Sequence, residues 1–242
     1  MELWGITDKG KVRRQNQDVY RTLYDEERHL GVVVVCDGMG GAKAGNIASR
    51  LAADSFMESL MSHIAADIDE LSLGMLDAVA DANEILFEKS ISDPSCSGMG
   101  TTLVAAVVTD GGSVVINVGD SRAYHIRGDR IAQITADHSV VEDMVRRGEI
   151  TRQEAKGHPN KNLITRALGT SETVEADLFR PELEKGDILL LCSDGLSNTA
   201  EDSELCAAAH TGPNIRAACA KLLELSLSRG APDNITVALM KI

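Results

Sequence analysis

Residues 32–38 read VVVVCDG and residues 188–195 read ILLLCSDG, so the chain uses one pattern twice. Each copy begins with a continuous apolar run, which indicates a strand buried on both faces. Each run leads to a carboxylate, Asp37 or Asp194, and then to a glycine that allows a sharp turn and a close approach to a ligand. One copy alone is most simply a strand that ends in an Asp-Gly turn. Two copies draw attention to the acidic residues at the other strand ends.

Further carboxylates stand at comparable places. Asp120 follows an apolar strand, Asp233 precedes the last one, and Asp8 and Asp18 lie in the first polar segment, near Arg13. If these strand ends converge, several carboxylates share a small space, and close like charges cannot all ionise without a cation. Ligands that are all oxygen select Mg²⁺, Mn²⁺ or Ca²⁺ rather than zinc or copper.

A pair of cations bridged by one carboxylate suits the hydrolysis of a phosphate ester. The ions lower the pKa of a water molecule, orient it for in-line attack and neutralise charge on the phosphoryl oxygens. An arginine beside them would bind those oxygens in a bidentate fork, and Arg13 is the candidate. Taken alone, Arg13 is more simply a surface arginine in a solvated loop.

Composition narrows the classes of partner. The chain has 242 residues, of which 43% are hydrophobic and 25% charged, the balance of a soluble globular protein. The formal net charge of −13 argues against nucleic-acid partners and against anionic membrane surfaces. Aromatic residues make up 3%, too few for base-stacking platforms.

Other features indicate a cytoplasmic protein. The five cysteines are odd in number and lack CxxC spacing, which disfavours a disulfide framework or a structural zinc site. The first residues contain no basic segment followed by an apolar one, so no secretory signal is expected. No apolar run approaches the roughly 20 residues of a membrane span. We expect a monomer with one domain over residues 1–242.

Hydrophobic periodicity predicts antiparallel sheets flanked by helices, because strands joined by hairpins alternate with helices grouped in sequence. Turn signals at Asp110-Gly111-Gly112 and at Gly128-Asp129 mark two hairpins. Capping-box spacings at Ser139 and Thr151 predict two short helices inside a polar segment over about 139–163. The expected strands cover about 32–36, 101–109, 113–118, 122–127, 130–134, 188–192 and 235–241, and the longer helices about 45–66, 71–91 and 214–227.

Motifs of other phosphate enzymes are missing from the sequence. The glycine-rich residues 38–41 are not followed by the Lys-Ser/Thr of a P-loop. No cysteine has an arginine six positions later, so a thiolate nucleophile in a phosphate cradle is not expected. Neither a GxSxG elbow nor an HExxH zinc motif occurs.

Taken together and in order, the polar motifs resemble the metal-dependent serine/threonine protein phosphatases of the PPM or type 2C family, in particular its compact bacterial members. The resemblance covers nearly the whole chain, and although each motif is weak, the ordered set is specific. The motifs are DxGxxRxxNQD at 8–18, DGMGG at 37–41, MGTT at 99–102, GDSR at 119–122, DHS at 137–139, TRALG at 165–169, SDGL at 193–196 and DN at 233–234.

The resemblance implies an α+β fold, a four-layer α-β-β-α sandwich in which two antiparallel sheets are flanked by helices. It implies two Mn²⁺ or Mg²⁺ ions at one end of the sandwich, with a third, weaker ion site. It also implies that phosphoserine and phosphothreonine on proteins are hydrolysed in one step by a metal-bridging hydroxide. The phosphorylated proteins would be the substrates of a serine/threonine protein kinase that this chain counteracts.

The family pattern assigns a role to each site residue. Asp37 would bridge both ions, Asp194 and Asp233 would hold the first, and the Gly38 carbonyl would bind the second. Asp120, with Asp194, would supply the third site. Outside the ion sites, Arg13 would bind the substrate phosphate, Asp18 would act through a metal-bound water, and Asp8 would support the first loop.

Two positions depart from the pattern of some relatives. Gln17 replaces a glutamate, which leaves the second ion to Asp37, the Gly38 carbonyl and water. Met39 replaces a histidine thought to protonate the leaving group, and a methionine cannot do so. His138 is attractive as a substitute acid, but its place before Ser139 is more typical of a helix start.

Two alternatives remain open from the sequence. A phosphoprotein-binding pseudophosphatase would keep the fold without catalysis, although Asp37, Asp194 and Asp233 are all present. A two-metal phosphodiesterase or nuclease would share the ions, but the net charge disfavours nucleic-acid substrates. Residues 139–163 correspond to the flap of the family and are expected to shape substrate choice, or to be simply a solvated helical insert.

Overall fold

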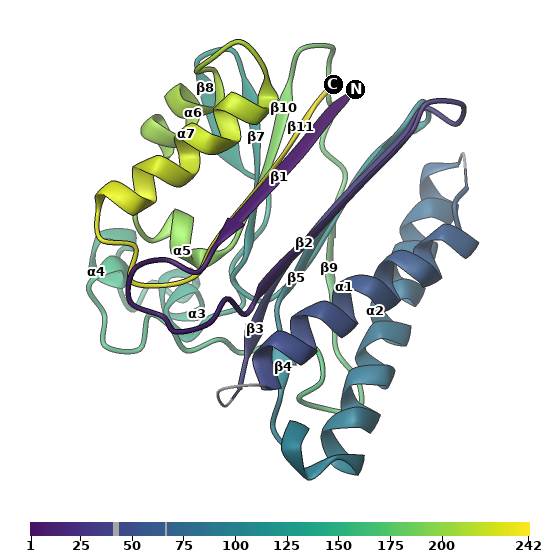
Figure 1. Cartoon of the computed structure of the whole chain (residues 1–242), viewed down its shortest axis with the longest axis vertical. Helices are drawn as coiled ribbons and strands as arrows, with labels where there is room; N and C mark the ends of the chain where they lie inside the picture. Colours follow the sequence, from purple (N-terminus) through teal and green to yellow (C-terminus); the bar gives the residue numbers. More distant parts are fainter. Residues whose placement is uncertain (41–43, 66) are drawn as a thin grey trace.

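Two antiparallel sheets stacked face to face form the centre of the molecule in the computed structural model, which describes residues 1–40, 44–65 and 67–242. The first sheet has the order β1 (Glu2–Asp8), β11 (Ile235–Lys241), β10 (Ile188–Cys192), β7 (Arg122–Arg127) and β8 (Arg130–Gln133). The second has the order β2 (Asp18–Asp25), β3 (Leu30–Met39), β5 (Leu103–Thr109), β6 (Gly112–Val118) and β9 (Asp177–Phe179), with β4 (Gly100–Thr101) beside β3. Because β1 pairs with β11, the two chain ends lie side by side (Figure 1).

Each apolar run buries both of its faces. Val33 and Val35 point into the layer between the sheets, where Leu189 and Leu191 also pack. The alternate residues of β3 face the helices that cover the second sheet, and those of β10 face the helices that cover the first sheet. The apolar runs of β3 and β10 are continuous because a strand that lies between two apolar layers has no polar face.

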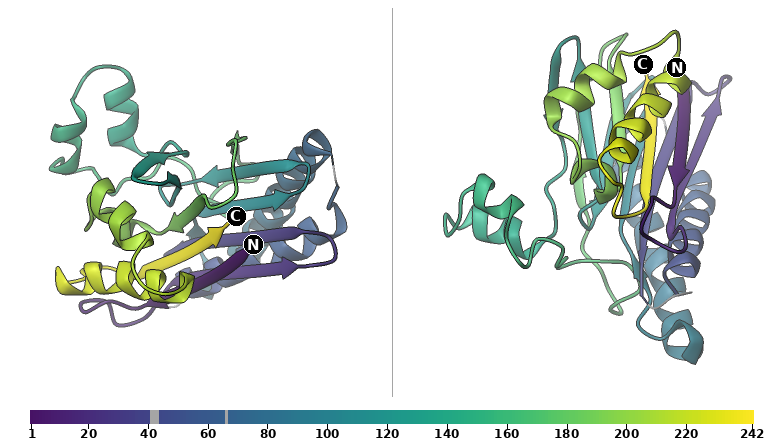
Figure 2. Two further views of the ribbon diagram at one scale, coloured as in Figure 1. Left: turned by 90° about the horizontal axis from the view of Figure 1, so that it is seen from above. Right: turned by 60° about the vertical axis from the view of Figure 1, so that its left-hand side comes forward.

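Helices cover the outer face of each sheet, as Figures 1 and 2 show. The second sheet carries α1 (Ala44–Ser62) and α2 (Ile68–Ser92), and the first carries α6 (Asp202–Ala209) and α7 (Ile215–Ser228). Side-chain N-caps stabilise the first turns of α2 and α7. The Asp67 side chain accepts from the Asp69 and Glu70 amides at the start of α2. The Asn214 side chain accepts from the Ala217 amide at the start of α7. The predicted α-β-β-α sandwich is confirmed.

Most predicted elements are present, with shifted ends. The helix expected over 45–66 ends at Ser62, and its last expected residue, Ala66, lies outside the described residues, as does Gly41 of the glycine-rich motif. The strand expected over 101–109 is interrupted at Thr102. Both expected hairpins occur, since Thr109 pairs with Gly112 and Arg127 with Arg130. The structure also contains elements that the sequence patterns did not predict, namely β1, β2, β9, α5 (Asp194–Ser197), α6 and the short 3-10 helix η1 (Pro94–Cys96).

The polar segment over 139–163 forms α3 (Val140–Arg146) and α4 (Arg152–Lys156), which stand away from the sandwich (Figure 2). Ser139 caps α3, and Thr151 with Glu154 forms a full capping box on α4. No residue of α4 is buried. Below, this segment is called the insert.

Two further observations concern the chain as a whole. All five cysteines lie in the described part of the chain, buried and not joined in disulfides. Among the described helices, none has both the length and the apolar character needed to cross a bilayer.

Candidate metal centre

A pocket of about 230 Å³ opens at one end of the sandwich, where the strands that carry the predicted carboxylates end. Its described lining consists of Arg13, Gln17, Asp37, Gly38, Met39, Gly40, Thr102, Asp120, Asn162, Ile164, Asp194, Asp233 and Asn234. Six of the predicted site residues belong to it, namely Arg13, Asp37, Gly38, Asp120, Asp194 and Asp233. The structure therefore brings these six residues together at one pocket.

Backbone contacts hold Asp37 near the end of β3. Its amide donates to Thr102 Oγ1 at 3.0 Å, and its carbonyl accepts from the Thr102 amide and Thr101 Oγ1, both at 2.9 Å. These bonds explain why the ladder breaks at Thr102 and why both threonines are buried. Thr101 and Thr102 thus support the site.

The glycines after the two carboxylates are required by close backbone contacts. A Cβ at Gly38 would lie 2.0 Å from the Gly45 carbonyl oxygen, and one at Gly195 would lie 1.9 Å from the Asn234 carbonyl oxygen. Any other residue would push these backbones apart. The repeated Asp-Gly pattern therefore brings each carboxylate-bearing strand end against a second chain segment.

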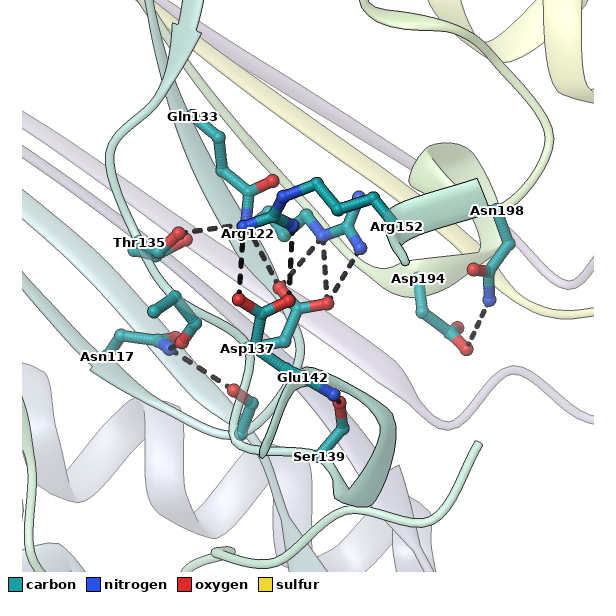
Figure 3. Close-up of polar contacts among 12 residues, drawn as sticks. Asn117, Arg122, Gln133, Thr135, Asp137, Ser139, Glu142, Arg152, Asp194 and Asn198 are labelled. Atoms are coloured by element: carbon teal, nitrogen blue, oxygen red, sulfur yellow. Dashed lines mark hydrogen bonds and ion pairs between the residues drawn. The ribbon is translucent and has the colours of Figure 1, made fainter. Parts of the chain in front are cut away.

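Asp194 is the first residue of α5, and only one of its oxygens is hydrogen-bonded. Asn198 Nδ2 donates to Asp194 Oδ2 at 3.0 Å, as Figure 3 shows. The other oxygen, Oδ1, is buried and has no hydrogen-bond partner. A buried oxygen without a donor costs free energy unless a cation or water satisfies it.

Asp18 lies behind the pocket rather than in its described lining. It stands directly opposite Asp37 in the β2–β3 register. Its Oδ2 accepts from Ser193 Oγ at 2.7 Å and from Thr236 Oγ1 at 2.8 Å, while Oδ1 is buried and unpartnered. The expectation that Asp18 belongs to the site is compatible with this place opposite Asp37, but the side chain of Asp18 is hydrogen-bonded to two hydroxyls.

Arg13 and Asp233 form an ion pair at the mouth of the pocket. Arg13 Nη2 lies 2.8 Å from Asp233 Oδ2, and the arginine side chain is 54% exposed. The loop that carries Arg13 is held by Asn234, whose Oδ1 accepts from the Gln17 amide and whose Nδ2 donates to the carbonyls of Lys9 and Gln15. An exposed guanidinium held by one carboxylate can reach an anion at the pocket mouth.

The carboxylates raise each other's pKa. Burial, followed by the charges of Asp18 and Asp194, raises the pKa of Asp37 well above its usual value. Burial and the charges of Asp120 and Asp233 raise the pKa of Asp194 to about 8. Burial raises the pKa of Asp18 to about 6 as well. These shifts are expected where like charges crowd a pocket shielded from water.

Asp120 has a further acid, Asp137, as its neighbour. Burial and the charge of Asp137 raise the pKa of Asp120 to about 6. Asp137 is itself held by the guanidinium of Arg122, with nitrogen to oxygen distances of 2.7 to 3.1 Å, and by Gln133 Nε2 at 3.1 Å (Figure 3). Asp137 is thus held away by its own partners, and of the two acids Asp120 is the one in the described lining of the pocket.

The donor set fits hard divalent cations. Its side-chain donors are carboxylate oxygens, and the unpartnered Oδ1 of Asp194 is an open ligand position. In the described part of the chain, no three acidic, histidine or cysteine side chains meet in one ready-made cage.

The other residues named from the sequence have structural places. Asp8 ends β1, and its Oδ1 accepts from the Gly10 amide at 2.8 Å, so it supports the first loop. His138 is buried, where its Nδ1 accepts from the Gly119 amide at 3.1 Å. Burial lowers the pKa of His138. It is absent from the described lining of the pocket, which agrees with a structural rather than an acid role.

Several lining residues were missed. Asn162 and Ile164 come from the segment that follows α4, and only the return of that segment to the body brings them to the pocket. That return is fixed by backbone bonds from Val140 to Leu163 and from Thr165 to His138. Asn234 was noted only as part of a motif, although its amide organises the loop of Arg13.

Comparisons with known proteins agree with this arrangement. Residues 10–221 match the family described as Protein phosphatase 2C. The serine/threonine phosphatase stp of Listeria innocua is 36% identical over 239 residues, which are 97% of this chain and 93% of that protein. The crystal structure of the serine/threonine phosphatase Stp1 of Staphylococcus aureus has a TM-score of 0.93 at 36% identity, over 100% of this chain and 94% of the other.

A third similar structure contains metal ions. The catalytic domain of the serine threonine protein phosphatase PstP, solved in complex with 2 manganese ions, has a TM-score of 0.86 at 32% identity. The similarity covers 98% of this chain and 96% of that one.

Proposed function

Because the chain belongs to the protein phosphatase 2C family and is a protein serine/threonine phosphatase, we propose that its carboxylate pocket is where phosphoserine and phosphothreonine are hydrolysed. The observation that carries this proposal is the meeting of Asp37, Asp120, Asp194 and Asp233 in one pocket from four distant parts of the chain. The raised pKa values of Asp37, Asp120 and Asp194 support a cationic occupant.

Two Mn²⁺ or Mg²⁺ ions are the proposed occupants. Asp37 would serve as a ligand of both ions, Asp194 and Asp233 would hold the first, and the Gly38 carbonyl would hold the second. Asp120, together with Asp194, would supply a third, weaker site. When bound, such ions lower the pKa of water and neutralise phosphoryl charge.

The protein's own side chains bind and orient the substrate. Arg13 is placed at the mouth of the pocket, where its guanidinium would bind two phosphoryl oxygens of the phosphate group. In the structure, the guanidinium is held by Asp233, with 2.8 Å between Arg13 Nη2 and Asp233 Oδ2. Asp18, opposite Asp37 and behind the pocket, would act through water held at the ion site rather than by contact with the substrate.

The described lining of the pocket contains no histidine that could protonate the leaving serine or threonine oxygen. Met39 stands in the pocket and has no proton to donate. Replacement of Met39 by histidine would therefore help most with leaving groups of high pKa.

Substrate choice is proposed to depend on the insert, because Asn162 and Ile164 bring the segment after α4 to the pocket. The natural substrates would be phosphoproteins made by a serine/threonine protein kinase, which this phosphatase counteracts. Its contact with proteins rather than nucleic acids is in keeping with the net charge of −13.

The test is phosphate release from a phosphothreonine peptide, measured with Mn²⁺, with Mg²⁺ and with a chelator. Release that requires the metal and is lost in Asp37→Asn is the expected result. Tight peptide binding without release would instead indicate a phosphoprotein-binding module. Cleavage of a phosphodiester but not of the peptide monoester would indicate a phosphodiesterase.

A further inference from the structure

A line of polar side chains runs from the first loop to Asp18, behind the pocket. Asn16 Nδ2 donates to Thr7 Oγ1 at 2.8 Å. Thr7 Oγ1 lies 2.7 Å from Thr236 Oγ1, and Thr236 Oγ1 donates to Asp18 Oδ2 at 2.8 Å. Below, Asn16, Thr7, Thr236 and Ser193 are together called the hydroxyl relay.

The direction of each hydrogen bond follows from chemistry. Asn16 Oδ1 accepts from the Asp18 amide at 3.2 Å, so the nitrogen of the same side chain faces Thr7 and can only donate. The single hydroxyl proton of Thr236 points to Asp18, so the Thr7 hydroxyl is the donor in the contact between the two threonines. Every bond of the line therefore points toward Asp18.

Ser193 supplies a second donor to the same oxygen. Its Oγ donates to Asp18 Oδ2 at 2.7 Å and accepts from the Thr236 amide at 2.9 Å. Ser193 and Thr236 are fully buried, and Asp18 is 4% exposed. Two donors converge on Oδ2, while Oδ1 has none, so the two oxygens of this carboxylate are not equivalent.

The relay also joins the two sheets beside the pocket. Thr236 belongs to β11 of the first sheet and Ser193 follows β10 of the same sheet, whereas Asp18 begins β2 of the second. Asp18 lies directly opposite Asp37 in the register of β2 and β3, and the side chains of directly opposite residues lie on the same face of a sheet, with Cβ atoms about 4.5–5.5 Å apart. A change in the orientation of Asp18 would therefore shift the Asp37 carboxylate.

We propose that Thr236, Ser193 and Thr7 are positioning residues, which fix Asp18 in one orientation and through it set the place of the Asp37 carboxylate. The proposal rests on the proposed function of the pocket. A packing role alone would be filled equally well by apolar residues, because buried polar groups replaced in pairs cost little. Groups that orient the ligands of a metal typically change its affinity about 10- to 100-fold when removed.

The test uses Thr236→Val, which removes the hydroxyl and keeps the shape, with Thr236→Ser as the variant that restores it. Mn²⁺ affinity is measured by titration calorimetry on folded protein, beside kcat and KM for a phosphothreonine peptide. We expect Thr236→Val to weaken Mn²⁺ binding about tenfold or more and to lower kcat, with KM little changed and Thr236→Ser close to the parent.

Ser113→Ala is the matched control, since Ser113 is also a buried hydroxyl in a strand. It donates to the Pro181 carbonyl at the end of β6 remote from Asp120. A role in folding alone would shift the melting temperature of both variants and leave Mn²⁺ affinity unchanged. Equal Mn²⁺ affinity of Thr236→Val and the parent would overturn the proposal.

A double-mutant cycle locates the effect at Asp18. If Thr236 acts through Asp18, adding Thr236→Val to Asp18→Ala changes Mn²⁺ affinity less than about twofold, because the carboxylate is already gone. Additive effects would contradict the relay.

Failure of the proposed function gives a different result. If the parent protein binds no Mn²⁺, the metal centre is wrong, and crystal structures of the parent and Thr236→Val then decide the relay. A turned Asp18 side chain in the variant supports it, and an unchanged one overturns it.

Discussion

The carboxylate pocket and the insert are built in opposite ways. The pocket joins side chains that lie far apart in the sequence, such as Asp37 and Asp194, and fixes them by strand pairing and close backbone contacts. In the insert, contacts are local, for example the capping box of Thr151 and Glu154 and the ion pair of Arg152 with Glu142. Its far end meets the body through an exposed ion pair between Lys156 and Glu201 at 2.7 Å.

This difference predicts how strongly substitutions in the two regions affect stability and activity. The packing of the sandwich holds the pocket carboxylates together against their mutual repulsion, and this repulsion lowers the free energy of unfolding. Exposed ion pairs and caps each contribute about 1 kcal/mol or less. Changes in the pocket should therefore alter activity strongly, and changes in the insert should alter little except substrate choice.

The largest effect is expected at Asp37, the proposed ligand of both ions. Asp37→Asn should lower kcat by about 10²–10³-fold or more, the range seen when one electrostatic stabiliser of a transition state is removed. The fold should survive, and without metal the melting temperature should rise, because one of several repelling charges is gone. Phosphopeptide assays and thermal melts measure both.

Asp77→Asn is the control for that variant, because Asp77 is an exposed carboxylate on α2. It should match the parent in both measurements. Activity retained by Asp37→Asn would show that the pocket does not depend on its central acid.

The next effect concerns Arg13, the exposed side chain at the pocket mouth. Arg13→Ala should raise KM for a phosphopeptide about 10- to 150-fold, which corresponds to the roughly 1.5–3 kcal/mol of a charge-assisted hydrogen bond. Stability should hardly change, since the ion pair with Asp233 is solvent-exposed.

Arg14→Ala in the same loop is the matched comparison, because Arg14 has the same charge and is not in the described lining. Similar kinetic constants for the two variants would remove Arg13 from phosphate binding.

A pH series in the presence of a chelator tests the electrostatic cost of the pocket. The folded-state pKa values of Asp18, Asp120 and Asp194 are raised to about 6, 6 and 8, so between pH 4 and 8 the folded state holds more protons than the unfolded one. Stability must then fall as the pH rises through this window. For a chain of this size, each 1 kcal/mol lost lowers the melting temperature by about 2–4 °C.

Saturating Mn²⁺ should remove most of this dependence, since the cation replaces the protons. A melting temperature that rises between pH 4 and 8 in the chelator would show that the carboxylates do not repel one another.

The smallest effect is expected in the insert. Lys156→Ala breaks the exposed pair with Glu201 and should change stability by no more than about 1 kcal/mol. Turnover of a small phosphopeptide should stay within about twofold of the parent.

Lys221→Ala, which breaks an exposed pair with Glu224 on α7, is its counterpart in the body. A much larger loss of stability in Lys156→Ala than in Lys221→Ala would mean that the insert is part of the packed core.

Local sequence patterns predicted much of this molecule. The apolar runs at 32–36 and 188–192, the caps at Ser139 and Thr151, and the two hairpin turns all appear in the structure. Each of these signals is complete within a few residues. Strands β1 and β2 were missed because they are partly exposed and mix polar with apolar residues, which weakens their period.

The sequence by itself determined which carboxylates stand at strand ends and which residues begin helices, because spacing and capping act over a few residues. Only the tertiary structure decided that Asp18 faces Asp37, that Ser193 and Thr236 bind Asp18, and that Asn234 holds the loop of Arg13. Those contacts depend on strand register and on packing between sheets. Register is set by the fit of whole buried faces, and no short stretch of sequence contains that information.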